Sequence, residues 1–352
     1  MENRLNITKS AYYLNERVAR LTRRQLSIPK KALIQTCRVK MLVVTDYGGS
    51  FGDNEGFGLG HFLRAFDEPL PFTSFEITKA HRRSDEDADI ENFRFHEHDL
   101  SRYDVIWLFA VERPAFRPSG QPVLTLTDAE LRAVSEYMDQ GGGIFATGDH
   151  EDLGVDMCGR IPRIRSMRRW FTAANPGPNE EPFAPAQTGI GRHDTIVDIN
   201  PALAGVQGDQ SDLTPQKIKL NYRYRTYHMG SVIRRQVKYP HLVLCSPDGA
   251  INVLPDHMHE GNCEVPADLT KAFNFAGYAI QEYPMVGRAR LTPEVIAEAV
   301  NHVTNSDFGV IAVLDGHQTN QIGRVLVDAT WHHFFNINIA QFGQLKQAVT
   351  MV

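Results

Sequence analysis

Short apolar runs that end abruptly in ionisable residues constrain the fold of this chain most. The runs "MLVVT", "VIWLFAV" and "GIFATG" are followed at once by Asp46, by Glu112, and by Asp149 with His150. Runs of this length, rich in β-branched and aromatic residues, are typical of buried strands. The chain therefore delivers polar side chains to the ends of several internal strands.

Helical patterns lie between these runs. The first run passes through a glycine-rich loop into a helical pattern that ends near residue 66, and residues 73–82 predict another strand. The segment 126–143 predicts a helix that begins with Thr127 and Asp128 as caps and stops at glycines. Strands that alternate with helices predict an α/β domain, a three-layer fold with a mostly parallel sheet whose ligands bind beyond the carboxyl ends of the strands.

The later part of the chain predicts further elements. Residues 292–303 predict a helix, residues 308–316 a strand, and residues 323–338 a strand running into His332 and His333. The charge-rich segment 81–100 is interpreted as an exposed loop and edge strand.

These patterns suggest a simple division of the chain. We expect residues 1–38 to form a basic N-terminal arm, and residues 39–352 to form one α/β domain. Within that domain, residues 155–265 combine an arginine-rich segment, a Pro/Gly loop and short strands, which predicts a β-rich insertion.

Composition excludes several classes. The 352 residues are 42% hydrophobic and 22% charged, and 37 basic residues against 42 acidic ones give a net charge of −5, so nucleic acid is not an expected partner. No signal peptide and no apolar run of about 20 residues is visible, so we expect a cytoplasmic protein without a membrane span, and a homo-oligomer is left open. Four cysteines without CxxC spacing indicate neither a zinc ribbon nor a disulfide framework.

The order of these parts resembles the class I glutamine amidotransferase-like fold, which is flavodoxin-like, and particularly its ThuA-like (trehalose utilisation protein-like) branch. The likeness covers roughly residues 38–335 and rests on the first strand–loop–helix unit, the strand and turn at 143–152, and the late strand ending in histidine. The resemblance implies a Gly-x-Cys-x-Gly turn with a nucleophilic cysteine. Here His150 stands in the place of that cysteine, so a cysteine-dependent amidotransferase is not expected.

The strand-end histidines are the catalytic candidates. A histidine titrates near neutral pH and a carboxylate can orient it, so Asp149 with His150 suits acid–base chemistry, and His332 corresponds by position to the late histidine of the family. The alternative is structural. Glu151 and Asp152 fit a helix N-terminus, and a late histidine can be a core residue that bonds to the backbone.

A second histidine pair is the metal candidate. His257 and His259 share a face if the segment is extended, and with Glu260 and His150 they would hold a divalent metal, zinc first and iron or manganese next. The alternative is a solvated polar loop.

Substrate-binding candidates surround the same edge. They are Asp46, Ser50, Asn54, Arg160 and His333. The glycine-rich loop lacks both the GxGxxG and the GK[ST] pattern, so no nucleotide cofactor is expected, although its backbone can bind an anion. The arginines at 160–169 and 223–235 recognise anions by chemistry, and acidic partners inside the protein are the commoner explanation.

The sequence therefore favours a hydrolase of a polar or anionic small substrate, with or without a metal ion. The alternative is a non-catalytic module that binds a sugar or an anionic metabolite, with aromatic residues such as Trp331 and Tyr227 lining the cleft. A subunit of a larger assembly is a third hypothesis.

Overall fold

The structure of the protein is a computed structural model. It describes residues 37–46, 49–67, 73–112, 125–148, 154, 157–169, 215–229, 233–246, 249–254, 261–275, 277–301, 305–316, 321–329, 331, 334–336 and 339. The N-terminal arm expected at residues 1–38 lies outside this part, except for its last two residues, which already belong to the first strand.

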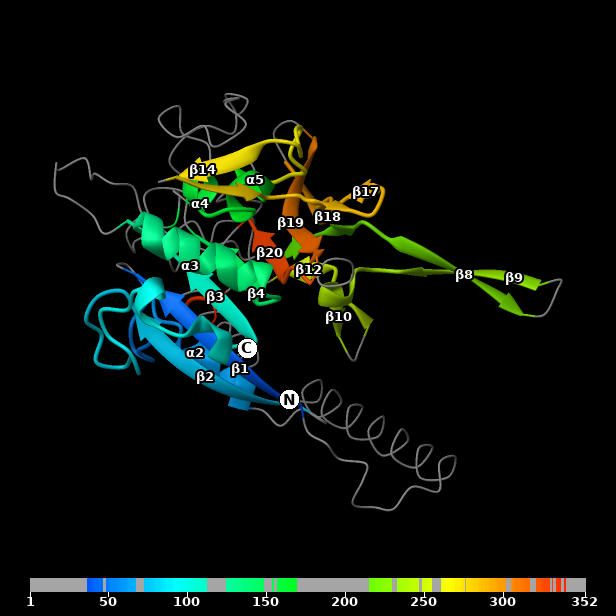
Figure 1. Ribbon diagram of the computed structural model, residues 1–352. Coiled ribbons are helices and arrows are strands. Elements are labelled where there is room, and N and C mark those ends of the chain that lie inside the picture. Colours follow the sequence, from blue (N-terminus) through cyan, green and yellow to red (C-terminus); the bar gives the residue numbers. More distant parts are fainter. Residues whose placement is uncertain are drawn as a thin grey trace, which may run out of the picture.

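The described residues form one eight-stranded mixed sheet, in the order β2-β1-β3-β4-β20-β19-β18-β7 (Figure 1). Its parallel part consists of β2 (Thr73–His81), β1 (Cys37–Thr45), β3 (Val105–Phe109), β4 (Gly143–Thr147) and β20 (Arg324–Asp328). Its antiparallel part adds β19 (Asp307–Asp315), β18 (Glu294–Val300) and β7 (Lys219–Leu220). The expected α/β class with a mostly parallel sheet is confirmed at this level.

The winding of the sheet reverses direction between β1 and β3. From β1 the chain proceeds to β2 on one side, and then returns to β3 and β4 on the other side. The strand ends are in register, because Thr45 pairs with Phe109 and Phe109 pairs with Thr147. The carboxyl ends of these strands therefore lie along one edge.

Alternating residues of the parallel strands enter two separate hydrophobic clusters. Leu42, Ile106 and Ile144 belong to the larger cluster, whereas Val43 and Phe109 belong to a smaller aromatic one. Because successive side chains of a strand point to opposite faces, both faces of the parallel sheet are buried.

The predicted helix at 126–143 is confirmed as α3 (Asp128–Asp139). Thr127 accepts a hydrogen bond from the Glu130 backbone, and the Glu130 side chain accepts one from the Thr127 backbone, which forms a capping box. The other helices are short: α2 (Gly60–Leu63), α4 (Met157–Arg160), α5 (Ile164–Met167), and the 3₁₀ turns η1 (Arg64–Asp67), η2 (Phe95–Glu97), η3 (Leu100–Arg102) and η5 (Leu242–Leu244). None of the described helices is long and apolar enough to cross a membrane.

The helix predicted at 292–303 is wrong, because this segment contains the strand β18. Ile296, Ala297 and Ala299 are buried between β19 and β7, and the register shifts between Val295 and Glu298. The irregular register breaks the two-residue alternation that would have marked a strand, and pairing on both sides outweighs the helix propensity of alanine and glutamate.

Short antiparallel pairs occupy most of the described part between 168 and 290, including the predicted insertion. The pairs are β5 (Arg168–Arg169) with β13 (Asn262–Cys263), β6 (Gln216–Lys217) with β12 (Val253–Leu254), β8 (Arg223–Met229) with β9 (Ile233–Tyr239), β10 (Cys245–Ser246) with β11 (Gly249–Ala250), β14 (Ala272–Phe275) with β15 (Tyr278–Gln281), and β16 (Met285–Val286) with β17 (Ala289–Arg290). The β8–β9 ribbon extends away from the sheet (Figure 1).

The interpretation of residues 81–100 as an exposed loop is confirmed for residues 83–92, which are exposed or half-buried, and is wrong at residues on either side of them. Arg82, Phe93 and Phe95 are fully buried. Ile90 forms a bridge with Ala80, so the segment folds back along β2. Burial of the Arg82 charge is possible because carboxylates surround it, as described below.

Candidate functional site

A row of polar side chains ends the parallel strands on one face of the sheet. His81, Thr45 and Thr147 occupy the last positions of β2, β1 and β4, and Phe109 separates the two threonines. Asp328 ends β20 one residue beyond the pair formed by Val327 and Ala146, and so lies beside Thr147. All four polar side chains are buried.

Three hydroxyl groups near this edge are buried without a hydrogen-bond partner among the described residues. They are Oγ1 of Thr45, Oγ of Ser50 and Oγ1 of Thr147. A buried hydroxyl without a partner costs about 1–3 kcal/mol, so such groups are rare in proteins. These three groups are therefore positions at which a bound molecule can form hydrogen bonds.

The backbone that follows β3 adopts an unusual conformation. Ala110 and Glu112 have φ angles of 53° and 67°, in the left-handed region that non-glycine residues seldom adopt. Each such residue costs of order 1–3 kcal/mol, and such conformations cluster at functional sites. The Ala110 amide donates a hydrogen bond to the Thr147 carbonyl, which ties this bend to the end of β4.

Two glycines hold the chain on either side of the Asp149–His150 segment. A Cβ atom on Gly154 would lie 3.0 Å from Cα of Gly148 and 3.3 Å from Cα of Ala110, and the φ of Gly154 is +80°. Gly154 is therefore required for this close approach. Gly148 and Gly154 meet at the carboxyl ends of β3 and β4, the edge at which the sequence predicts catalysis.

A buried ion-pair network lies behind this edge. Nε of Arg82 is 3.3 Å from Oδ2 of Asp46, and Nη1 of Arg82 is 2.5 Å from Oε1 of Glu130, with all three side chains fully buried. Burial raises the pKa of Glu130, but the hydrogen bond and charge of Arg82 outweigh it, so the pKa lies below its usual value. Asp46 also binds the partly exposed Arg83, with 3.3 Å between Oδ1 and Nε.

A second ion pair follows β3. Nη1 of Arg160 lies 3.2 Å from Oε1 of Glu112, and its Nη2 lies 3.2 Å from Oδ1 of Asp128. The other oxygen of Glu112 accepts a hydrogen bond from the Leu126 amide. Arg160 is therefore fixed at the end of β3, where its partly exposed guanidinium can bind an anion.

His81 was not predicted by the sequence analysis, because it lies at the start of the charge-rich segment. Its Nδ1 accepts a hydrogen bond from the Arg83 amide, so its Nε2 carries the proton that it donates to the Gly49 carbonyl at 3.0 Å. Gly49 has to be glycine, since a Cβ atom there would lie 2.2 Å from Oγ1 of Thr45. The signal that could have found His81 is its place at the end of a predicted strand.

The described part of the chain places four of the predicted site residues. Asp46 and Ser50 follow β1, and Arg160 is bound to Glu112 after β3. Asn54 lines a separate cavity of about 560 Å³ beside β2, together with Asp53 and Asp87 and with none of the other predicted site residues. The remaining candidates lie outside the described residues, and their convergence stays a prediction: Asp149, His150, His257, His259, Glu260, His332 and His333.

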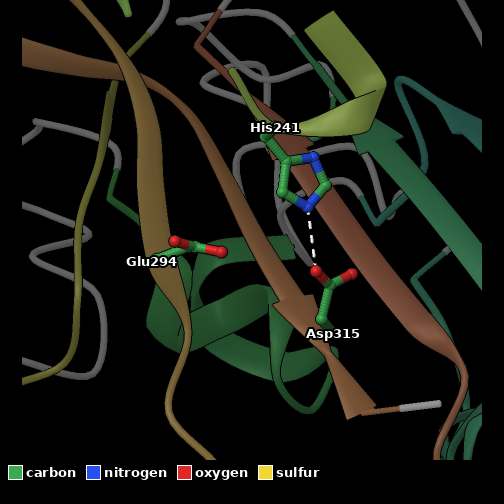
Figure 2. A group of neighbouring side chains, drawn as sticks. All are labelled: His241, Glu294 and Asp315. Carbon is green, nitrogen blue, oxygen red and sulfur yellow. Dashed lines mark hydrogen bonds and ion pairs between the residues drawn. The ribbon is translucent and has the colours of Figure 1, made fainter. Parts of the chain in front are cut away.

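A different histidine–carboxylate group lies at the opposite edge of the sheet. His241, Glu294 and Asp315 offer ligand atoms that all lie within 4.8 Å of one another, so they could hold a metal ion (Figure 2). Glu294 begins β18 and Asp315 ends β19, beside the amino end of the parallel strand β20. None of the predicted metal ligands belongs to this group.

Other groups already satisfy these carboxylates. Oδ1 of Asp315 binds Nε of Arg324 at 2.6 Å, and Oδ2 binds both Nε2 of His241 at 2.9 Å and Nη2 of Arg223 at 3.1 Å. Arg223 also pairs with Glu294. Because Nδ1 of His241 accepts a hydrogen bond from the Val243 amide, Nε2 carries a proton and is not a free ligand.

The charges at this group fix its protonation. Burial raises the pKa of Asp315, but hydrogen bonds from His241 and Arg324 and the charge of Arg324 outweigh burial and hold the pKa well below its usual value. Two guanidinium groups balance two carboxylates. The arrangement is therefore an ion-pair cluster, which a cation could enter only by displacing an arginine.

The arginine-rich segment confirms the expectation of acidic partners inside the protein. Arg163 pairs with Asp139, Arg165 with Glu282, and Arg169 with Glu264. Arg168 donates to the carbonyl of Gly148 at 2.5 Å.

Trp331 and Tyr227, the two aromatic residues expected to line a cleft, lie in different environments. Trp331 is 1% exposed and packs on Phe57 and Phe335, whereas Tyr227 is exposed on the β8–β9 ribbon. Trp331 therefore offers no open surface, and this form of the binding-module hypothesis is not supported.

The sequence matches no protein-family model, and the search of curated proteins found no match.

Proposed function

We propose that this protein is a hydrolase of a polar or anionic small substrate, and that the substrate binds beyond the carboxyl ends of β1, β3 and β4. The order of the parallel strands is that of doubly wound flavodoxin-like sheets, which bind ligands where the winding reverses. In this chain the reversal lies between Asp46 and Glu112. The same order supports a three-layer, amidotransferase-like fold of the ThuA type.

The observation that carries the proposal is the set of buried hydroxyls that have no hydrogen-bond partner in the described part of the chain. Thr45, Ser50 and Thr147 come from two strand ends and the loop after β1, and each has a hydroxyl at or near this edge that the described residues leave unsatisfied. A substrate with several oxygen atoms would satisfy them. The free energy lost in the unliganded protein would then return as binding energy.

The residues divide into binding and reacting groups. Arg83 and Arg160 hold partly exposed guanidinium groups that would bind the negative charge of a substrate. In this proposal His150, oriented by Asp149, takes a proton from the attacking water, and His332 donates one to the leaving group. His257, His259 and Glu260, with His150, would hold zinc, iron or manganese if the water is activated by a metal.

One observation favours the alternative of a binding module without catalysis. Asp46 and Glu112, the carboxylates that follow β1 and β3, are each bound by arginine. A carboxylate held in this way positions a cation and is a poor general base. Catalysis therefore depends on the histidines. Replacement of His150 distinguishes the two proposed functions, because a hydrolase needs this histidine and a binding module does not.

The test is the variant His150→Ala, with His96→Ala as a control at a partly exposed histidine of η2. The purified proteins are assayed with chromogenic phosphate esters, carboxylic esters, amides and glycosides. We expect the wild-type protein to hydrolyse one of these classes, His150→Ala to lower kcat/KM by about 10²–10⁴-fold, and His96→Ala to leave it unchanged.

Two results would contradict the proposal. Turnover that survives in His150→Ala would remove the catalytic assignment. A compound that raises the thermal midpoint of both wild type and His150→Ala, with no turnover in any assay, would favour the binding module.

A further inference from the structure

The β8–β9 ribbon is a basic arm inside an acidic protein. Residues 223–239 contain five lysines and arginines and no aspartate or glutamate, while the whole chain has a net charge of −5. Among the described strands these two pair only with each other, and they extend away from the sheet (Figure 1). The charge is therefore concentrated on the most projecting of the described elements.

Apart from Arg223, which pairs with Glu294 and Asp315, the cations of the ribbon have no acidic partner among the described residues. Arg225, Arg234, Arg235 and Lys238 therefore differ from the arginines at 160–169, because most of those arginines pair with carboxylates of the protein. Lys238 instead lies over the ring of Tyr222, with 3.8 Å between Nζ and the ring centroid, and Cζ of Arg225 lies 5.2 Å from the ring centroid of Tyr227. These positive charges remain available to an external partner.

The strand register distributes the cations over both faces of the arm. Arg225, Tyr227 and Arg235 share one face, because Tyr227 pairs with Arg235 and alternate residues point the same way. Tyr224 and its partner Lys238 share the other face with Arg234. Tyr224 is 59% exposed and Tyr227 is 45% exposed, so each face also presents an aromatic ring.

We propose that the β8–β9 ribbon binds in the major groove of double-stranded DNA. The groove is about 12 Å wide and admits a two-stranded β-ribbon, which then faces phosphates on both sides. A seven-residue strand spans about 23 Å, enough to cross the groove. Cations on both faces match this environment.

Two other nucleic acids fit the arm less well. Single strands bind by stacking successive bases on aromatic residues along a groove, whereas Tyr224 and Tyr227 lie on opposite faces. The major groove of double-stranded RNA is deep and narrow and excludes side chains. DNA duplex is therefore the occupant that the geometry favours.

The cluster around Asp315 anchors the arm. Arg223 begins β8 and His241 follows the end of β9, and both bind Oδ2 of Asp315. Both legs of the ribbon are thus tied to the end of β19. This role accounts for the histidine–carboxylate group without a metal ion, and it is independent of the proposed hydrolase site at the opposite edge.

The test is binding of a fluorescent DNA duplex of about 20 base pairs, measured by anisotropy between about 50 and 200 mM salt. Two double variants each remove two cations from one face: Arg225→Ala with Arg235→Ala, and Arg234→Ala with Lys238→Ala. Arg102→Ala with Arg288→Ala removes two exposed arginines elsewhere as a control of equal charge. Circular dichroism checks that all three fold.

We expect the wild-type protein to bind the duplex with a strong salt dependence. Each arm variant should raise Kd by about 10- to 100-fold near 100 mM salt and reduce the slope of log K against log salt by about two, since each lost phosphate contact removes about one. The control should leave both values unchanged. Single-stranded DNA and duplex RNA of the same sequence should bind more weakly.

Three results would overturn the proposal. The first is no binding of the duplex by the wild-type protein at about 50 mM salt. The second is equal weakening by the control and the arm variants, which would indicate an effect of net charge alone. The third is tighter binding of the single strand or of the RNA duplex, which would assign the arm to that nucleic acid instead.

Discussion

At the scale of single residues, the carboxyl edge combines buried charge with buried hydroxyls that the other described residues leave unpaired. Arg82 bridges Asp46 and Glu130 without contact with solvent. Loss of one member of such a network leaves a charge without compensation, which costs about 3–5 kcal/mol. The network therefore holds three parts of the chain in one fixed geometry. They are the carboxyl end of β1, the N-terminus of α3 and the start of the segment that follows β2.

The buried hydroxyls of this edge predict a trade-off, in which a variant that gains stability binds the substrate more weakly. In Thr147→Val a methyl group replaces a buried hydroxyl that has no partner among the described residues, so we expect the free energy of unfolding to rise by up to about 1–3 kcal/mol. The substrate should bind more weakly, because it loses a hydrogen-bond partner. Urea unfolding and KM measure the two effects.

The matched control for this variant is Thr226→Val, which makes the same replacement at an exposed position of β8. It should change neither value. A loss of stability in Thr147→Val would mean that its hydroxyl is satisfied in the unliganded protein and does not mark a binding site.

Sequence patterns predicted residues whose role follows from their neighbours in the chain. Thr127 caps α3, as expected from its position before an apolar helical pattern, and Asp46 follows the last residue of β1. His81 and Arg82 were not predicted as site residues, because their burial depends on partners such as Glu130, which is distant in the sequence. A run of charged residues in the sequence does not show which of them pair with distant carboxylates in the fold.

At the scale of elements, α3 could be recognised from local sequence signals, whereas β18 is a strand because of its pairing with other strands. α3 carries its own signals, a capping box and terminal glycines, and was predicted from them. β18 has no such signals, and its register shift disturbs the alternation of buried residues. Its identity as a strand comes from β19 and β7 on either side, which a local pattern does not contain.

The anchoring of the ribbon predicts a pH-dependent effect of Asp315→Asn. The folded pKa of Asp315 lies below its unfolded value of about 3.9, so the charged form contributes stability at neutral pH, and this contribution is lost as the pH falls below about 4. We expect the variant to lose about 1–3 kcal/mol of unfolding free energy at pH 7, and the difference from wild type to shrink in acid.

Chemical denaturation across this pH range measures the difference, and Asp67→Asn serves as a control at an exposed aspartate of η1. Trypsin cleavage at the arginines of the ribbon should also be faster in Asp315→Asn. A stability difference that stays constant from neutral to acidic pH would show that the ion pairs of Asp315 do not produce it.

At the scale of the whole molecule, different polar groups lie at the carboxyl and amino ends of the parallel strands. The carboxyl edge holds partly exposed arginines and hydroxyls without a partner in the described ranges, while the opposite edge holds a saturated ion-pair cluster that supports the ribbon. The mostly parallel sheet was predicted from the alternation of apolar runs and helical patterns. The basic arm was hidden, because a charge summed over 352 residues averages a local excess of cations with acidic segments elsewhere.

The projection of the ribbon predicts that it can be removed without damage to the fold. Arg223 and Tyr239 are paired, so Asn-Gly can join them in place of residues 224–238 as a two-residue hairpin turn. We expect a thermal midpoint within about 4 °C of wild type, because little of the core is lost, together with unchanged hydrolysis and no binding of DNA.

The same shortening of β14–β15 is the matched contrast. Asn-Gly would join Ala272 to Gln281, and the deletion removes Phe273, on which Arg165 stacks, and Tyr278, which lies under Arg132. This variant should lose clearly more thermal stability than the ribbon variant. Equal losses would show that the ribbon supports the fold and is not a separate arm.

The two outermost strands of the main sheet have a consequence for self-association. β7 is two residues long, and its Lys219 binds Asp307 and Glu298, while residues 89 and 90 cover the far end of β2 by hydrogen bonds to Lys79. Short, charged or covered borders give a second copy of the chain little backbone to pair with. We therefore expect concentrated solutions of this protein to resist stacking into fibrils.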